Sequence, residues 1–120
     1  MTGEVLMQQD PVTFEVVRGG LYAICEEMKF VMMRASFSPL LSLSADLSCA
    51  ILDQKGDVVA QGNDIPVHLG AMPFSAKGII DAFPLETWRP GDAVLNNDPY
   101  SGGSHLPDMT LLTPLFDAVG

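Results

Sequence analysis

Residues 10–35 read DPVTFEVVRGGLYAICEEMKFVMMRA and form the longest regular segment of the chain. Their apolar residues recur at spacings of three and four, which predicts one long amphipathic helix. Asp10 is a suitable N-cap, and Pro11 suits the first helical position. We expect this helix to pack into the core through one apolar face, made of Phe14, Val17, Leu21, Ile24, Met28 and Val31.

The remainder of the chain alternates strand-like and helix-like segments. Phe37-Ser38-Pro39 ends the first helix, because the residue before a proline disfavours helical backbone. The later elements are expected to be a β-hairpin (46–52 and 58–61 around a turn at 53–57), a helix at 71–83 with Pro73 in its first turn, a short buried strand at 93–95, a loop at 96–108 and a strand at 109–116. The fold class is therefore α+β: a long N-terminal helix, a β-hairpin, a second helix and a strand–long loop–strand unit.

The last residues, Phe116-Asp117-Ala118-Val119-Gly120, read as a strand that enters a turn and is followed by no further helix or strand. We therefore expect a fragment of a larger domain. Residues 1–9 would be a disordered N-terminal tail, and residues 10–120 would be the N-terminal part of that domain.

The composition is globular and argues against several classes of partner. Of 120 residues, 15 are acidic and 6 are basic, and the net charge of −9 would repel nucleic-acid phosphates. No apolar run reaches the roughly 18 residues that span a bilayer, and residues 1–10 lack a secretory-signal pattern. We expect a cytoplasmic protein that binds neither nucleic acid nor membrane. The acidic excess serves solubility, or gathers carboxylates around a cation.

One loop carries the residues best suited to chemistry. Residues 97–108 read NDPYSGGSHLPD, and loops of this length inside compact domains are usually functional. His105 and Asp108 offer a nitrogen and an oxygen donor that can reach one cation if the two residues between them form a turn. Such a pair suits Zn, Mn, Fe or Ni better than Ca. The structural alternative is that His105 hydrogen-bonds the loop and Asp108 caps a turn.

The other candidate ligands each have a structural alternative. His68 either contributes to a site or is a partly buried structural histidine. Asp46, at the start of a strand, either reaches a neighbouring site or is a turn residue. Asp64 and Asp98 have the same two interpretations.

The sequence gives little evidence for a nucleophilic active site or a phosphate-binding loop. Cys25 and Cys49 lack metal-type spacing, and their apolar neighbours predict buried free thiols. Gly102-Gly103 is not followed by the Lys-Ser or Lys-Thr of a phosphate loop. Neither serine that flanks this glycine pair lies in a nucleophile elbow.

Four motifs resemble those of the hydantoinase B/oxoprolinase family, and together they cover nearly all of the chain from Asp10 to Phe116. They are Asp10–Val17, Asp46–Ala50 with its following turn, Ile65–Pro73 and Asn97–Asp108. The last two motifs together are the most specific.

The resemblance implies the N-terminal part of a metal-binding subunit. Its ligands would be the His and Asp of the H-L-P-D motif, here His105 and Asp108, and the strand aspartate, here Asp46, with a further histidine ligand downstream. The metal would be a divalent transition metal such as Zn, Mn or Fe. By the same resemblance, Asp98, Gly102 and Gly103 are expected to contact substrate, and His68 either contacts substrate or supports the metal ligands from behind. No residue is assigned a catalytic role.

The resemblance also implies a division of labour between two subunits. A hydantoinase A-type partner would use ATP and Mg to phosphorylate the substrate, which is a hydantoin, 5-oxoproline or a ketone such as acetone. The complex would hydrolyse a cyclic amide or carboxylate the ketone. The alternative is a non-catalytic assembly module that docks on the A-type partner through its long helix.

Overall fold

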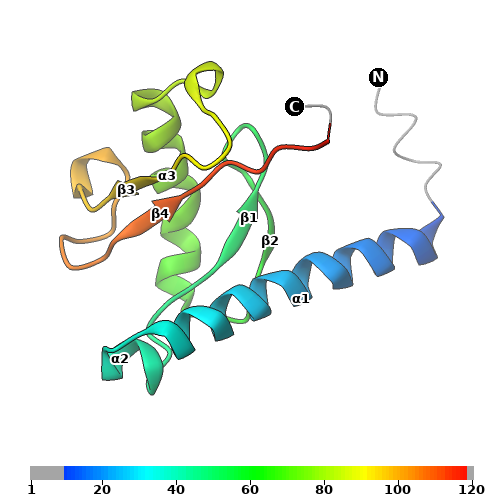
Figure 1. The fold of residues 1–120 in the computed structure, drawn as a ribbon, viewed down its shortest axis with the longest axis horizontal. Coiled ribbons are helices and arrows are strands. Elements are labelled where there is room, and N and C mark those ends of the chain that lie inside the picture. Colours follow the sequence, from blue (N-terminus) through cyan, green and yellow to red (C-terminus); the bar gives the residue numbers. More distant parts are fainter. Residues whose placement is uncertain (1–9, 119–120) are drawn as a thin grey trace.

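Helix α1 is the longest element of the computed structural model, which describes residues 10–118 (Figure 1). Two antiparallel hairpins and a second long helix follow it, so the predicted α+β class is confirmed. The expected tail at residues 1–9 lies outside the described residues. In chain order the elements are α1 (Pro11–Ala35), α2 (Pro39–Ser42), β1 (Ala50–Leu52), β2 (Val58–Gln61), α3 (Pro66–Ala82), η2 (Leu85–Thr87), β3 (Val94–Asn96), η3 (Pro99–Ser101) and β4 (Thr110–Leu112).

The hairpin β1–β2 lies between the two long helices. Helix α1 contacts both of its strands, and so does α3, which also carries the second hairpin, β3–β4 (Figure 1). The packing order is therefore α1, β1–β2, α3 and β3–β4. Within residues 10–118, no helix combines the length and apolarity needed to cross a membrane.

Helix α1 begins where the capping residues predict. The Asp10 carboxylate accepts hydrogen bonds from the backbone N–H of Val12 (3.3 Å) and from Thr13 Oγ1 (3.3 Å), and Pro11 occupies the first turn. The bond from Val12 satisfies a backbone donor that the helix itself leaves unpaired.

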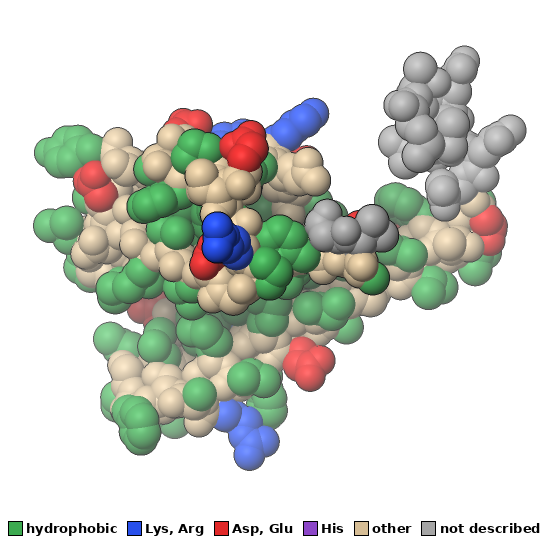
Figure 2. Space-filling view, turned by 45° about the horizontal axis from the view of Figure 1, so that its top comes forward, with side chains coloured by type: hydrophobic (Ala, Val, Ile, Leu, Met, Phe, Trp, Pro, Cys, Tyr) green, Lys and Arg blue, Asp and Glu red, His purple; other side chains and the backbone are tan. Residues whose placement is uncertain are grey.

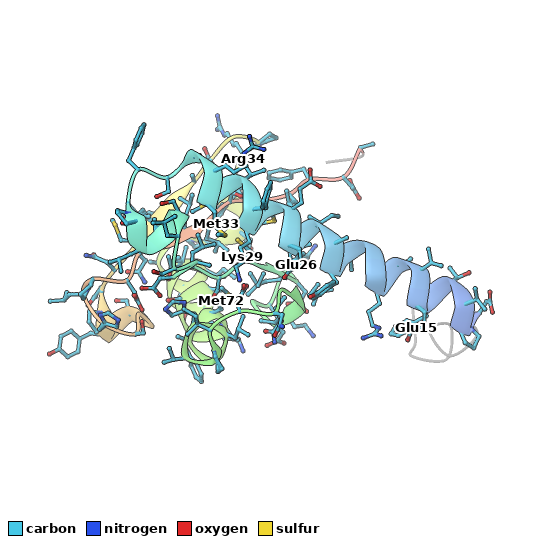
Figure 3. All side chains as sticks on the ribbon, turned by 90° about the horizontal axis from the view of Figure 1, so that it is seen from below. Glu15, Glu26, Lys29, Met33, Arg34 and Met72 are labelled. Carbon is cyan, nitrogen blue, oxygen red and sulfur yellow. The ribbon has the colours of Figure 1, made fainter. Side chains whose placement is uncertain are left out.

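The prediction that the apolar stripe of α1 packs into the core was wrong within the described chain. Phe14 is 60% exposed and Val31 is 57% exposed, whereas Cys25 is fully buried. Figure 3 shows Glu26 and Lys29 on the side of α1 that faces the rest of the chain, and Figure 2 shows hydrophobic side chains on the part of the helix that projects from the body. Periodicity identified the helix but not its buried face, because the inward polar side chains have partners elsewhere in the sequence.

A buried ion pair joins α1 to the segment that precedes α3. Lys29 Nζ lies 2.5 Å from Asp64 Oδ1, and the Asp64 side chain is completely buried. Asp64 Oδ2 also accepts the backbone N–H of Cys49 at 3.0 Å, just before β1. The hydrogen bond to Asp64 raises the pKa of Lys29. The contribution of the Lys29 charge is therefore fully present below the ordinary lysine pKa and is lost as pH rises through the raised one.

The first hairpin is shorter than predicted. Strand β1 begins at Ala50, so residues 46–49 precede the ladder, and a register shift after Ile51 marks a bulge. The turn at 53–57 is confirmed. The Asp53 carboxylate accepts two backbone N–H groups of the turn, and Gly56 takes the left-handed conformation (φ 80°) that favours glycine.

Helix α3 begins earlier than predicted. It covers Pro66–Ala82, so residues expected to lead into a helix at 71 form its first turns, and Pro73 lies inside it. Pro66 suits the first helical position, and the Ile65 carbonyl accepts the N–H of His68 at 3.1 Å. His68, expected just before a helix, is therefore helical.

The second hairpin also differs from the prediction. Strand β3 pairs with β4, but β4 ends at Leu112 rather than continuing to 116, and Pro114 follows it. The strand at 93–95 was expected to be buried, yet Leu95 is 56% exposed. A two-stranded sheet that packs on α3 through one face leaves alternate side chains outside.

We expect Lys29→Met to lower the free energy of unfolding by about 3–5 kcal/mol, because it leaves the buried Asp64 carboxylate without its cation. Lys77→Met is the matched control. The Lys77–Asp57 pair (2.9 Å) has side chains 51% and 60% exposed, and exposed pairs contribute about 0–1 kcal/mol. Urea unfolding followed by circular dichroism measures both variants, and equal losses would contradict the assigned role of the buried pair.

Candidate functional site

Two segments distant in sequence meet the first turn of α3. His68 Nε2 lies 3.8 Å from Asp46 Oδ1 and 3.9 Å from Asp108 Oδ2. The same Asp108 oxygen lies 3.2 Å from His105 Nε2. Two imidazoles and two carboxylates therefore gather at one place, and we call these four residues the His–Asp cluster.

Asp46 is placed by the extended segment between α2 and β1. Its N–H donates to a carbonyl of α2 at 3.0 Å, and the preceding Ala45 takes a left-handed conformation (φ 52°). Leu47 and Cys49 are buried. Side chains alternate along extended chain, so Asp46 and Ser48 turn to the opposite face from these two core residues.

The ring of His68 is oriented by Ser48. The hydroxyl oxygen of Ser48 lies 3.1 Å from Nδ1 of His68, which leaves Nε2 facing the carboxylates. The His68 side chain is 18% exposed, and of its two ring nitrogens Nδ1 has a hydrogen-bond partner in Ser48.

The loop before β4 is held against α3 by close backbone packing. A Cβ added at Gly102 (φ 89°) would lie 2.2 Å from the carbonyl oxygen of Phe74, and one at Gly78 would lie 2.2 Å from that of Ser101. Ser75 Oγ donates to the Gly102 carbonyl at 2.8 Å. These contacts leave no room for side chains at the two glycines.

Each end of this loop forms its own turn. Asp98 accepts hydrogen bonds from Ser101 Oγ (2.7 Å) and from the N–H of Tyr100 (3.0 Å), and these two bonds lower the pKa of the Asp98 carboxyl. At the other end, the N–H of Asp108 donates to the His105 carbonyl at 3.0 Å. That turn is the one the sequence required for the two side chains to approach each other.

The donor chemistry of the cluster fits a transition metal. With both rings neutral, the four residues carry two negative charges, which attract a cation. Donors bound to one ion at about 2.0–2.2 Å lie roughly 3–4 Å apart, and His105 Nε2 and Asp108 Oδ2, two of the expected ligands, lie in that range at 3.2 Å. As the side chains stand, however, no group of three His, Cys, Asp or Glu within residues 10–118 is arranged to hold a metal ion. Binding therefore requires rotation of side chains, and those of Asp46 and His105 are 49% and 61% exposed.

The structure brings together His68 and the three expected ligands, while their metal and substrate roles stay predictions. Asp98 and Gly102 make contacts within their loop and with α3, and Asp64 belongs to the ion pair with Lys29. Ser48 was not predicted as a site residue. The sequence feature that could have indicated it is its position two residues after Asp46, between the apolar Leu47 and Cys49.

The two cysteines are free and buried, as the sequence predicts. Burial raises the pKa of both thiols, that of Cys49 to about 11. The thiolate is the nucleophilic form and is scarce at neutral pH under these conditions, so neither cysteine is a candidate nucleophile.

Comparison with known proteins gives one family and several relatives. A family model described as Hydantoinase B/oxoprolinase matches residues 10–119. An uncharacterised protein of Methanocaldococcus jannaschii is 39% identical over 109 residues, which cover 89% of this chain and 19% of the relative. The 5-oxoprolinase of Dictyostelium discoideum is 35% identical over 112 residues, which cover 93% of this chain and 9% of the relative. Caprolactamase subunit beta of Pseudomonas jessenii is 36% identical over 107 residues, which cover 89% of this chain and 18% of the relative.

The chain thus spans less than a fifth of the length of these curated relatives. No solved structure matches it.

We expect neither thiol to react appreciably with iodoacetamide at pH 8 while the chain is folded, because both are buried and protonated. Both should be alkylated in guanidinium chloride. Mass spectrometry of the intact chain after timed exposure counts the added groups, and rapid labelling of Cys49 in the folded protein would contradict its burial.

Proposed function

Because this chain belongs to the hydantoinase B/oxoprolinase family, we propose that it contributes the His–Asp cluster to a divalent transition-metal site in an ATP-dependent cyclic-amide hydrolase. The observation that carries the proposal is the approach of Asp46, His105 and Asp108 around His68. Relatives named 5-oxoprolinase and caprolactamase support hydrolysis of a cyclic amide C–N bond. Carboxylation of a ketone is the other reaction that the family resemblance allows.

Asp46, His105 and Asp108 would hold the ion, which we propose to be Zn, Mn or Fe. The two aspartates would bind as carboxylates and His105 as neutral imidazole, because a ligand must present a lone pair. The bound ion would polarise a carbonyl or hold water. Asp98, Gly102 and Gly103 remain proposed substrate contacts beside it, and a further histidine ligand would come from downstream of this chain.

We further propose that an A-type subunit supplies ATP and Mg and phosphorylates the substrate oxygen. The word subunit in the name of the caprolactamase relative supports a multi-subunit arrangement. The substrate would be a small cyclic amide such as 5-oxoproline or a hydantoin, and the complex would act in the cytoplasm.

A second candidate function is docking on the A-type subunit through α1. It is supported by the apolar side chains that α1 leaves exposed, among them Val12 (68%), Val16 (69%) and Phe30 (59%). Apolar patches larger than a few hundred Å² are rare on monomeric proteins and mark interaction sites.

The metal proposal predicts about one transition-metal ion per chain in the complete polypeptide that carries this sequence. His105→Ala and Asp108→Asn should each lower metal content at least tenfold, because each removes a ligand. Elemental analysis by mass spectrometry after dialysis measures the content. Asp98→Asn is the control in the same loop, since the amide oxygen can still accept the N–H of Tyr100 and the amide NH2 can donate to the Ser101 hydroxyl oxygen, and it should keep the metal. Full retention in both ligand variants would exclude the site.

The docking proposal predicts that Val16→Glu abolishes co-purification of the A-type subunit without changing the helical circular dichroism, because a charge would enter the apolar contact. Glu15→Gln is the neighbouring control and should leave the association intact. Unchanged association of the Val16 variant would show that this part of α1 is not the contact.

A further inference from the structure

His68 and Ser48 have no place in the proposed ligand set, yet they form the most enclosed part of the cluster. The His68 side chain is 18% exposed, against 49% for Asp46 and 61% for His105. The ring stands between carboxylates that come from segments 62 residues apart in sequence, 46 and 108. We infer that Ser48 and His68 are a positioning pair that orients the two carboxylate ligands, an inference that rests on the proposed metal site.

The donor and acceptor groups around His68 indicate which of its ring nitrogens carries the proton. Ionised carboxylates are acceptors only, whereas a hydroxyl can donate or accept. Nε2 faces two carboxylate oxygens, from Asp46 and Asp108, and Nδ1 faces the Ser48 hydroxyl at 3.1 Å. We assign the tautomer in which the Ser48 O–H donates to Nδ1 and the proton is on Nε2, because Nε2 then presents an N–H rather than a lone pair to the two carboxylates. His68 is then a donor toward the carboxylates and has no lone pair to offer a metal.

One oxygen of each carboxylate, Asp46 and Asp108, faces His68. Asp108 Oδ2 faces His68 at 3.9 Å and His105 at 3.2 Å, and it also accepts a hydrogen bond from Ser104 Oγ. Asp46 presents Oδ1 to His68 at 3.8 Å. One oxygen of each carboxylate is thus turned to the protein, which leaves Asp108 Oδ1 and Asp46 Oδ2 for the cation.

The separations of 3.8 and 3.9 Å exceed the length of a direct hydrogen bond. Rotation of either aspartate, the same rotation that metal binding requires, would bring one oxygen within reach of Nε2–H. Hydrogen bonds of this kind to ligating carboxylates typically change metal affinity 10–100-fold. The pair would therefore act on the metal through Asp46 and Asp108 rather than by touching it.

Co²⁺ titration of the complete polypeptide, followed by visible absorption, tests this inference. His68→Ala should weaken Co²⁺ binding 10–100-fold, because the carboxylates lose their donor. His68→Gln should bind within a few-fold of the unaltered protein, since its amide N–H can replace Nε2–H. Its absorption bands should be unchanged in position and intensity, because the ligand set is the same. Ser48→Ala should weaken binding, and Ser48→Thr, which keeps the hydroxyl, should restore it.

His105→Gln is the reference variant, since it removes a proposed ligand and must alter the absorption bands. If His68→Gln alters them in the same way, His68 is itself a ligand and the inference is overturned. It is equally overturned if His68→Ala binds Co²⁺ as tightly as the unaltered protein. If the unaltered protein binds no Co²⁺, the proposed metal site and the positioning pair are both overturned, whereas the two outcomes above overturn the positioning pair alone.

Discussion

A carboxylate without access to water needs a cation and hydrogen-bond donors, and Asp64 obtains both from distant parts of the chain. Lys29 of α1 provides the charge, and the N–H of Cys49 provides the second donor. Asp64 precedes the start of α3 by two residues, and Cys49 directly follows Ser48. The same buried oxygen atoms therefore fix where α1 lies, where β1 begins and where α3 starts. The distance between the Asp46 and His68 sides of the cluster follows from that arrangement.

Features that depend on neighbours in sequence were predictable. The Asp10 cap, the turn around Asp53 and Gly56 and the break at Pro39 each rest on local hydrogen bonds or backbone preferences. The buried face of α1 was not predictable, because the inward Lys29 is satisfied only by a residue 35 positions away. The start of α3 was missed for a related reason: Pro66 and Pro73 both suit a first turn, and only tertiary packing selects Pro66.

In the candidate site, too, the residues that depend on sequence neighbours were predictable and those that depend on distant residues were not. His105 and Asp108 lie three residues apart on one turn, so their approach could be expected from the sequence. The residues alone left Asp46 as either a site residue or a turn residue, and only the family resemblance predicted it as a ligand. Nothing local connects Asp46 to the loop that ends at Asp108. Ser48 was missed because its role depends on His68, which is 20 positions away. Gly102 was expected to contact substrate, and the structure adds a separate reason for glycine there, the close approach of the Phe74 carbonyl.

The proposed metal site requires that segments around residues 46, 68 and 105–108 enclose one cation. Anomalous diffraction from crystals of the complete polypeptide grown with Mn²⁺ can locate such an ion. We expect an anomalous peak about 2.0–2.2 Å from His105 Nε2 and from one oxygen each of Asp46 and Asp108, with His68 turned toward the other carboxylate oxygens. A peak bound to other residues, or the absence of a peak at this cluster in crystals that diffract well, would contradict it.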